Sequence, residues 1–302
     1  MTATAATSYH CNVCFTDSGP EVETATPRCN VRRFATERFT VWRCPSCKSI
    51  HAGDQVDLDY YYSGYPFHGD GELDPAQRAV YGNMVRRLRR AGLRKEHAIL
   101  DYGCGSGALV TFLRAAGYAN AHGYDQYSPK FRQPELLERR FDCIVSQDVI
   151  EHVHEPWEFL RMFDRLANPG AILAIGTPNA EAVDLKDTEW FIHALHQPYH
   201  RHIMSATFLR EMGGKLGWEL VRYYPTEYLN TLVPFINLRF VLHYLQAFDN
   251  TMDVAFEKKR IDSWKLWTPL SLWFGLFGYF HSDDSGVMVI YRKGGGRPAL
   301  PA

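Results

Sequence analysis

Short apolar runs alternate with amphipathic segments through the middle of the chain. Runs with the length of buried strands occupy residues 98–101, 121–125 and 141–147. Segments with helical spacing lie before and between them, at 76–90 and 109–116. Strands that are buried on both faces have nearly continuous apolar sequences, and in parallel sheets they alternate with helices. The pattern therefore predicts a doubly wound α/β fold with a mostly parallel sheet.

The second half of the chain continues the same alternation. It predicts helices over 157–166 and 206–216 and strands over 171–176, 218–224 and 286–292. Ser205 can cap the second of these helices, and Gly217 can end it. The last strand is expected to run antiparallel to its neighbours.

An insertion rich in Leu, Phe, Trp and Tyr separates the last two strands, at 225–285. Structureless loops of this length are uncommon in compact domains, so we expect helices. Three roles are open: a packing or dimer face, a wall for a lipophilic substrate, and a surface that docks on a membrane. Its longest apolar stretch, 264–280, is shorter than a membrane span and is interrupted by Lys265, Pro269 and Gly275. We expect no stable membrane insertion, and a homodimer through this insertion is one expected arrangement.

The most informative stretch, residues 99–107, reads Ile-Leu-Asp-Tyr-Gly-Cys-Gly-Ser-Gly. A strand that turns into a helix through glycines brings backbone N–H groups and a helix N-terminus close to a ligand. Asp125, at the end of the next strand, stands where Rossmann-type sheets bind the hydroxyls of a ribose. The spacing is Asp-x-Gly-x-Gly-x-Gly, not the G-x-G-x-x-G of dinucleotide sites. The Asp101 carboxylate would repel a diphosphate but suits a ligand with an ammonium group.

This arrangement resembles the first motif of the class I S-adenosylmethionine-dependent methyltransferases. Residues 148–156, Asp-Val-Ile-Glu-His-Val-His-Glu-Pro, are similar to the segment after strand four in many of the family's small-molecule enzymes. Residues 168–179 and 196–205 are similar to two further stretches of the family. The resemblance covers about 75–292, and it implies a Rossmann-like methyltransferase fold with a sheet of the seven-stranded type.

The resemblance also implies a binding site for S-adenosyl-L-methionine. Asp101 and the glycine loop would hold the methionine portion, and Asp125 would accept the ribose hydroxyls. Residues after strand four would form the floor of the pocket near the sulfonium. The full expected set is Asp101, Gly103, Cys104, Gly105, Gly107, Asp125, Gln126, Gln147, Asp148 and Val149.

The sequence departs from the family between Asp125 and Phe141, where only 15 residues intervene. Family members usually carry a helix, a third strand and an acidic adenine-binding loop in this place. Here the section is shortened. Glu135 and Leu136 are candidates for the adenine contact, which stays unassigned.

Methyl transfer from a sulfonium is an in-line displacement that requires alignment of donor and acceptor and exclusion of water. A hydroxyl acceptor needs a general base, whereas a carboxylate does not. His152 and His200 are the expected catalytic bases, because the pKa of imidazole lies close to neutral pH. The alternatives are a capping or cofactor-positioning role for His152 and a structural hydrogen bond for His200. A cluster around Arg201 can instead hold an anionic substrate: His193, His196 and His202.

Two Cys-x-x-Cys pairs near the N-terminus predict a structural zinc site. The pairs are Cys11 with Cys14 and Cys44 with Cys47, and 29 residues separate them. Four thiolates close the tetrahedral coordination of one Zn²⁺ and leave no position for water. Residues with strand propensity between the pairs are typical of a zinc ribbon. His10 and His51 flank the pairs and are candidates for hydrogen bonds to the thiolates. A ribbon without metal and a redox pair are the alternatives.

The chain has 302 residues and a net charge of −1, which favours neither nucleic acid nor an anionic membrane through a global field. The expected division is a zinc-ribbon-like module at 1–58, an aromatic linker with a leading helix at 59–97, and the methyltransferase domain at 98–302. Four tyrosines within residues 60–65 either pack between domains or line the cleft. The N-terminus lacks the pattern of a secretory signal, so we expect a soluble cytoplasmic enzyme.

O-methylation of a hydroxyl or carboxyl group on a small molecule is the leading expected activity. C-methylation of a sugar or another natural-product intermediate comes next, because ribbon-bearing sugar C-methyltransferases have a similar plan, and N-methylation is third. A protein- or nucleic-acid-modifying factor that docks through the ribbon belongs to another class. The near-neutral charge and the absence of an Asn-Pro-Pro-Tyr-type loop argue against base methylation, and no nucleic-acid partner is expected.

Overall fold

The computed structural model describes residues 8–65, 73–260, 263–281 and 285–294. Its centre is a six-stranded sheet with the order β11-β12-β9-β8-β6-β7. The strands are β6 (Ile99–Tyr102), β7 (Ala121–Tyr124), β8 (Phe141–Gln147), β9 (Ala167–Pro178), β11 (Trp218–Tyr224) and β12 (Gly286–Lys293). β7, β6, β8 and β9 are parallel, and β12 runs antiparallel to both β9 and β11. The predicted doubly wound, mostly parallel α/β fold is therefore confirmed.

Along the sequence, no strand forms between β7 and β8, and residues 126–140 in this section are all described. That section holds only a short 3-10 helix, Pro134–Glu138. The third strand that the seven-stranded type carries at this place is thus missing, as the short spacing after Asp125 suggested.

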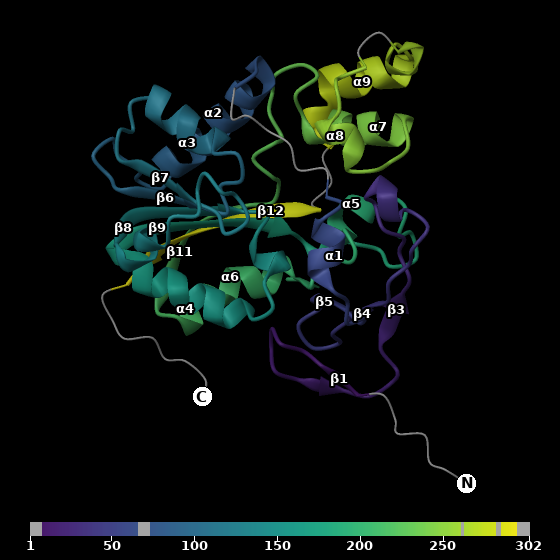
Figure 1. Cartoon of the computed structure of the whole chain (residues 1–302), viewed down its shortest axis with the longest axis horizontal. Coiled ribbons are helices and arrows are strands. Elements are labelled where there is room, and N and C mark those ends of the chain that lie inside the picture. Colours follow the sequence, from purple (N-terminus) through teal and green to yellow (C-terminus); the bar gives the residue numbers. More distant parts are fainter. Residues whose placement is uncertain (1–7, 66–72, 261–262, 282–284, 295–302) are drawn as a thin grey trace.

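Two pairs of helices cover the two faces of the sheet (Figure 1). α2 (Pro75–Arg90) and α3 (Ala108–Ala115) lie on one face, and α4 (Pro156–Leu166) and α6 (Ala206–Lys215) lie on the other. Asp74 begins α2 with a capping box that Gln77 completes. Ser205 caps α6 as predicted, because its hydroxyl accepts a hydrogen bond from the N–H of Phe208 at 3.1 Å.

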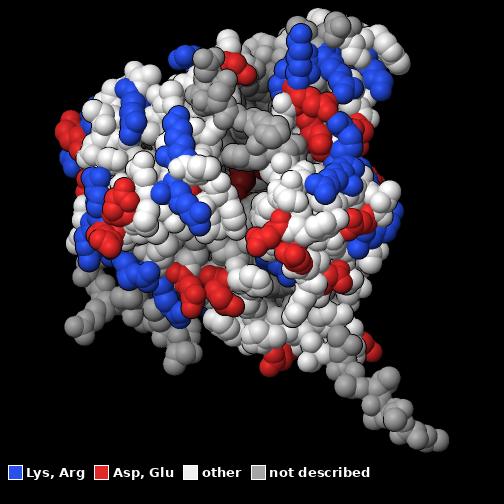
Figure 2. Space-filling view, in the orientation of Figure 1, with Lys and Arg blue, Asp and Glu red and all other residues white. Residues whose placement is uncertain are grey.

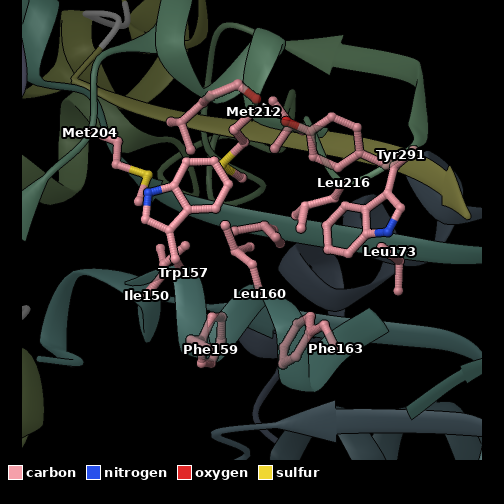
Figure 3. Close-up of a cluster of buried hydrophobic side chains, with 14 of the residues drawn as sticks. Ile150, Trp157, Phe159, Leu160, Phe163, Leu173, Met204, Met212, Leu216 and Tyr291 are labelled. Atoms are coloured by element: carbon pink, nitrogen blue, oxygen red, sulfur yellow. Dashed lines mark hydrogen bonds between the residues drawn. The ribbon is translucent and has the colours of Figure 1, made fainter. Parts of the chain in front are cut away.

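The larger core cluster lies between the sheet and the helices α4 and α6 (Figure 3). Leu160 and Phe163 of α4 are fully buried, and they face Leu173 of β9 and Tyr291 of β12. Burial of one such side chain stabilises a fold by about 1.5–3 kcal/mol. This packing fixes β8 and β9, and with them the loop that follows β8.

The N-terminal part forms a second sheet that the rest of the chain completes. Its short strands are β1 (Tyr9–His10), β2 (Asp17–Ser18), β3 (Glu23–Ala25), β4 (Val41–Arg43) and β5 (Ile50–Ala52). β3, β4 and β5 form one sheet with β10 (His202–Ile203), in the order β10-β5-β4-β3. Helix α1 (Leu58–Tyr62) then leads toward the larger domain, and α5 (Ile192–Leu195) precedes β10. A strand about 150 residues downstream in the sequence therefore closes the sheet of the cysteine-bearing module.

The insertion between β11 and β12 is helical, as predicted. It contains α7 (Leu238–Ala247), α8 (Asp253–Phe256) and α9 (Pro269–Phe277), with short 3-10 helices at Trp264–Leu266 and Gly278–His281. Within the described residues, every helix is too short or too polar to cross a bilayer. The expected linker and insertion include residues 66–72, 261–262 and 282–284, which lie outside the described residues.

Candidate active site

The glycine loop joins β6 to α3 at the carboxyl edge of the sheet. Gly103 and Gly107 have φ angles of +79° and +81°, in the left-handed region that favours glycine. A Cβ at Gly103 would lie 2.2 Å from Val149 Cγ2, and one at Gly107 would lie 2.1 Å from the Phe131 ring. Backbone conformation and lack of space therefore both require glycine at these two predicted positions.

Asp125 follows β7, and its side chain connects the glycine loop to the loop after β7 through hydrogen bonds. Its Oδ2 accepts a hydrogen bond from the N–H of Gly105 at 2.9 Å. Its Oδ1 accepts from the N–H groups of Tyr127 and Ser128 at 2.8 and 3.0 Å. A carboxylate offers about four lone-pair positions, so these bonds leave room for a further donor such as a hydroxyl. The neighbouring Gln126 is exposed.

Asp101 lies buried at the end of β6, with 5% of its surface exposed. Burial raises the pKa of its carboxyl group to about 7, and the negative charge of Asp125 adds to the shift. A cation beside Asp101 would favour its ionised form. The position thus suits a ligand that carries an ammonium group, as the sequence predicts.

The residues after β8 lie next to the glycine loop. The N–H of Asp148 donates to the carbonyl of Gly176 at 3.0 Å, and Asp148 has a φ of +55°. Burial raises the pKa of the Asp148 carboxyl group to about 6. Gln147 folds back on the Ser146 carbonyl, and Val149 contacts the position where Gly103 lacks a Cβ. Of the three predicted floor residues, Val149 therefore adjoins the glycine loop, whereas Gln147 and Asp148 bond to residues of β8 and β9.

Phe131 is a residue of this site that the sequence did not suggest. Its ring packs against Gly107 and Gly123, and Cys104 Sγ also adjoins Gly123. The backbone of Phe131 bonds to Asp125 through its carbonyl. It lies in the shortened section after β7, where no periodic pattern gives a signal.

The two predicted bases come together in a cluster of imidazole and tyrosine rings. The ring centroids of His152 and His200 are 4.7 Å apart, and those of His196 and His200 are 4.9 Å apart. Tyr62 Oη lies 3.1 Å from His152 Nδ1. Tyr65 packs against the rings of His196 and Tyr199.

The tyrosines of the linker divide between the two roles that the sequence left open. Tyr62 and Tyr65 belong to the imidazole cluster. Tyr61 instead packs against Phe34 and Phe39, and its hydroxyl donates to Glu37 at 2.6 Å. Tyr60 also packs against Phe34 and Tyr61, so two of the four tyrosines serve packing and two line the candidate site.

Burial disfavours the protonated, positively charged form of the imidazoles in this cluster. It lowers the pKa of His152 to about 4 and the pKa values of His196 and His200 well below the usual range. Their rings are therefore neutral at pH 7. The Nδ1–H of His200 donates to the Ala194 carbonyl at 2.8 Å, which leaves its Nε2 with a lone pair.

Glu151 is a second group that the sequence analysis missed, although it directly precedes His152. It is fully buried; its Oε2 accepts from the Thr177 hydroxyl at 2.9 Å, and its Oε1 has no hydrogen-bond partner among the described residues. His200 Nε2 lies 3.9 Å from that oxygen. Burial, with a contribution from Asp148, raises the pKa of Glu151 well above its usual value. Glu151, His152 and His200 offer ligand atoms within 4.8 Å of one another, so this set has the chemistry to hold a proton or a divalent cation.

The Arg201 side chain presents free donors next to this cluster. Its Nη2 donates to the Asp54 carbonyl at 3.0 Å, while Nε and Nη1 are buried with no partner among the described residues. His193, which the sequence grouped with it, bonds instead to Asn30 and Asn250.

Figure 2 shows the surface hollowed between the two parts of the molecule, with an acidic side chain in the hollow.

The four predicted metal ligands meet in the N-terminal module. Cys11 Sγ lies 3.6 Å from Cys47 Sγ, and Cys14 Sγ lies 3.7 Å from Cys44 Sγ. All four sulfurs lie within 4.8 Å of one another. Four thiolates at the usual Zn–S length of about 2.3 Å would be about 3.8 Å apart, so the cluster fits one tetrahedral ion. His51 Nε2 lies 3.2 Å from Cys11 Sγ, as expected for one of the two flanking histidines.

Comparison with known proteins identifies one family. Residues 76–223 match a family model described as a methyltransferase domain. The ubiquinone biosynthesis O-methyltransferase of Caulobacter vibrioides is 32% identical over 102 residues, which cover 27% of this chain and 40% of that protein. Protein arginine N-methyltransferase 1 of Chlamydomonas reinhardtii is 32% identical over 83 residues, which cover 26% of this chain and 24% of that protein. The chain thus spans less than half the length of these two relatives.

Among solved structures, an S-adenosylmethionine-dependent methyltransferase from Archaeoglobus fulgidus aligns with a TM-score of 0.43 at 15% identity. The alignment covers 78% of this chain and 99% of that one.

Proposed function

The chain belongs to the class I S-adenosylmethionine-dependent methyltransferases through residues 76–223, and we propose that it methylates an oxygen atom of a small molecule. The observation that carries this proposal is the position of the glycine loop. It lies between two acids, Asp101 and Asp125, and it contacts Val149, whose carbonyl accepts a hydrogen bond from the N–H of His152 at 3.0 Å. This connection supports a site in which the cofactor and the acceptor lie close together.

S-adenosyl-L-methionine supplies a methyl group that the positive sulfur already activates. Asp101 would receive the ammonium group of the cofactor. Asp125 would accept a ribose hydroxyl through its remaining lone pair. Gln147, Asp148 and Val149 would lie beneath the sulfonium.

His152 would act on the acceptor. Its imidazole is neutral at pH 7 and can take a proton from a hydroxyl as the oxygen attacks the methyl carbon. Tyr62 orients the ring through its contact with Nδ1. The free donors of Arg201 suit a carboxylate on the same acceptor.

An oxygen acceptor is also supported by the name of the Caulobacter relative, an O-methyltransferase of ubiquinone biosynthesis. We further propose that the four cysteines hold a structural Zn²⁺ and that residues 1–58 form a zinc-ribbon-like module. The closed thiolate sphere leaves the ion no catalytic position. In this proposal the larger domain alone performs the chemistry.

The test is a mass-spectrometric screen for products heavier by one methylene, with phenols, carboxylic acids, sugars, peptides and oligonucleotides as acceptors. We expect methylated phenols or acids together with S-adenosylhomocysteine. His152→Ala should slow transfer to hydroxyls more than transfer to carboxylates, because only hydroxyls need the base. Products on sugar carbon alone, or on peptides or oligonucleotides alone, would overturn the assignment.

A further inference from the structure

The outer surface of the insertion carries an unusual set of exposed large apolar side chains. Trp264 is 76% exposed, Trp267 is 63% exposed and Phe280 is 72% exposed. They belong to a continuous stretch that includes α9. We call this set the apolar face, and it consists of Trp264, Trp267, Leu270, Trp273, Leu276 and Phe280.

Helix α9 buries small residues and exposes large apolar ones, which is the opposite of the usual pattern in a surface helix. Its buried positions are the small residues Ser271 and Gly275, which lie four apart on the side that faces α7. Gly275 allows the ring of Phe235 to approach, and the Asn237 side chain bonds to the carbonyl of Phe274 at 3.0 Å. Most of its large residues are exposed instead, whereas Phe274 packs against His243 and Arg239 of α7. A surface helix normally buries its large apolar side chains, so this face is adapted to contact something other than water.

Basic residues border the apolar face. Lys258, Lys259 and Arg260 precede it and are exposed, and Lys265 lies within it and is exposed. Residues 263–281 contain no Asp or Glu, although Asp262, Asp283 and Asp284 flank them in the sequence. Figure 2 shows Lys and Arg side chains on this lobe, with a group of Asp and Glu side chains beside them; α7, α8 and α9 form the lobe in Figure 1. Tryptophan next to lysine is the composition that favours the boundary between lipid headgroups and acyl chains.

A second copy of the chain fits this face less well than a lipid surface. A two-fold interface brings the same patch of both subunits together. It would therefore place Lys258, Lys259 and Lys265 close to their own equivalents, and like charges repel. An anionic headgroup layer neutralises the same residues while the tryptophan rings enter the interface.

We propose that the apolar face docks the protein on the surface of an anionic lipid bilayer. The contact is peripheral, because the helices of the described residues are too short or too polar to span a bilayer. The insertion also adjoins the candidate active site. Phe256 of α8 packs against Tyr65, and Asn83 of α2 bonds to the carbonyls of Tyr228 and Asn230. Docking would therefore hold the site near the membrane surface.

The test is co-sedimentation of the full chain with vesicles. One set is an equimolar mixture of phosphatidylcholine and phosphatidylglycerol, and the other is phosphatidylcholine alone. We expect binding to the mixed vesicles, weaker binding to the neutral ones, and release from the mixed vesicles by salt. The double variant Trp264→Ser, Phe280→Ser should bind at least about tenfold more weakly.

Phe15→Ser is the matched control, because Phe15 is an exposed aromatic residue in the other module and is 49% exposed. It should bind vesicles like the unmodified chain. The single variant Trp264→Ser repeats the test with the smallest change to the fold, and far-UV circular dichroism checks both variants. Light scattering should find monomers in each case.

Absence of vesicle binding by the unmodified chain would overturn the proposal. So would a dimer that the Trp264→Ser variant converts to monomer, because a second copy would then cover the face. Equal loss of binding in the Phe15→Ser control would assign the contact to another surface.

Discussion

At the scale of single residues, two acidic side chains of the site favour a positively charged ligand. Asp101 is buried beside the glycine loop, and burial, with the charge of Asp125, raises the pKa of its carboxyl group to about 7. An ammonium ligand needs the ionised carboxylate. Binding of such a ligand is therefore coupled to loss of a proton from this group in the physiological pH range.

We predict that the affinity for S-adenosylmethionine falls as the pH drops below 7. Asp101 is ionised above its pKa and protonated below it, so the dissociation constant should rise by up to about tenfold for each further pH unit. Calorimetric titration between about pH 5 and pH 8 measures this dependence. The amine of the cofactor stays protonated in the lower part of this range, so the change in affinity there reports on Asp101. Asp101→Asn should bind more weakly and lose most of the dependence. A flat profile for the unmodified chain would contradict the role of Asp101.

A second prediction concerns Asp125. Asp125→Ala removes the acceptor for three backbone N–H groups of the two loops. Cofactor affinity should fall by at least about tenfold, because the loops lose their connection and the ribose loses its partner. Calorimetry with Asp125→Asn as the milder variant measures the effect. Unchanged affinity in Asp125→Ala would reject the assignment.

At the scale of elements, the two modules share one sheet. β10 pairs with β5 through the registers His202–His51 and Ile203–Ile50. The N–H of Ala52 also donates to the carbonyl of Arg201 at 2.9 Å. The cysteine cluster therefore supports, through β5, the segment that carries His200 and Arg201.

We predict that Cys14→Ser lowers metal content and thermal stability together. Structural zinc contributes several kcal/mol to folding, so the melting temperature should fall by on the order of 10 °C. Elemental analysis and scanning calorimetry measure the two quantities. Cys29→Ala, at a buried cysteine outside the cluster, should keep its metal. Native protein without zinc would end this claim.

The elements that the sequence predicted well are those with a local pattern. The apolar run at 141–147 coincides with β8, because burial in the sheet leaves a nearly continuous apolar signal. The predicted strand at 218–224 coincides with β11, although only its first residue is buried. β10 was not predicted, since a two-residue strand that pairs with a partner about 150 residues away has no periodicity of its own. The positions of Phe131 and Glu151 were missed for a related reason: one lies in an irregular loop, and the other owes its role to burial against Thr177 and His200.

At the scale of the whole molecule, Arg32 connects the N-terminal module to the insertion. Its guanidinium pairs with Asp249 at 2.6 Å and with Glu257, and its N–H donates to Asp253 at 2.8 Å. The pairs are about 40% exposed, so screening by water limits their contribution. Their main effect is to fix the position of the insertion beside the site.

We predict that Arg32→Ala costs no more than about 1 kcal/mol in the free energy of unfolding. Hydrogen exchange in residues 249–257 should nevertheless accelerate, because this segment loses two ion pairs with the other module, although it keeps backbone bonds such as that from Met252 to Asn30. Exchange in β8 should stay unchanged and serves as the internal control. Equal acceleration in both segments would indicate global destabilisation instead.

Because β10 pairs with β5, the N-terminal sheet cannot be completed until residues 202–203 have been synthesised. β5 remains an open edge until residue 203 has been synthesised, so the unpaired N–H and C=O groups of its backbone face solvent while most of the larger domain is still being made. Open strand edges recruit other strands, including those of neighbouring nascent chains. A fragment that stops just after β5 would keep that edge permanently. The N-terminal module is therefore not a detachable unit, and its protection against self-association is encoded in the distant part of the same polypeptide.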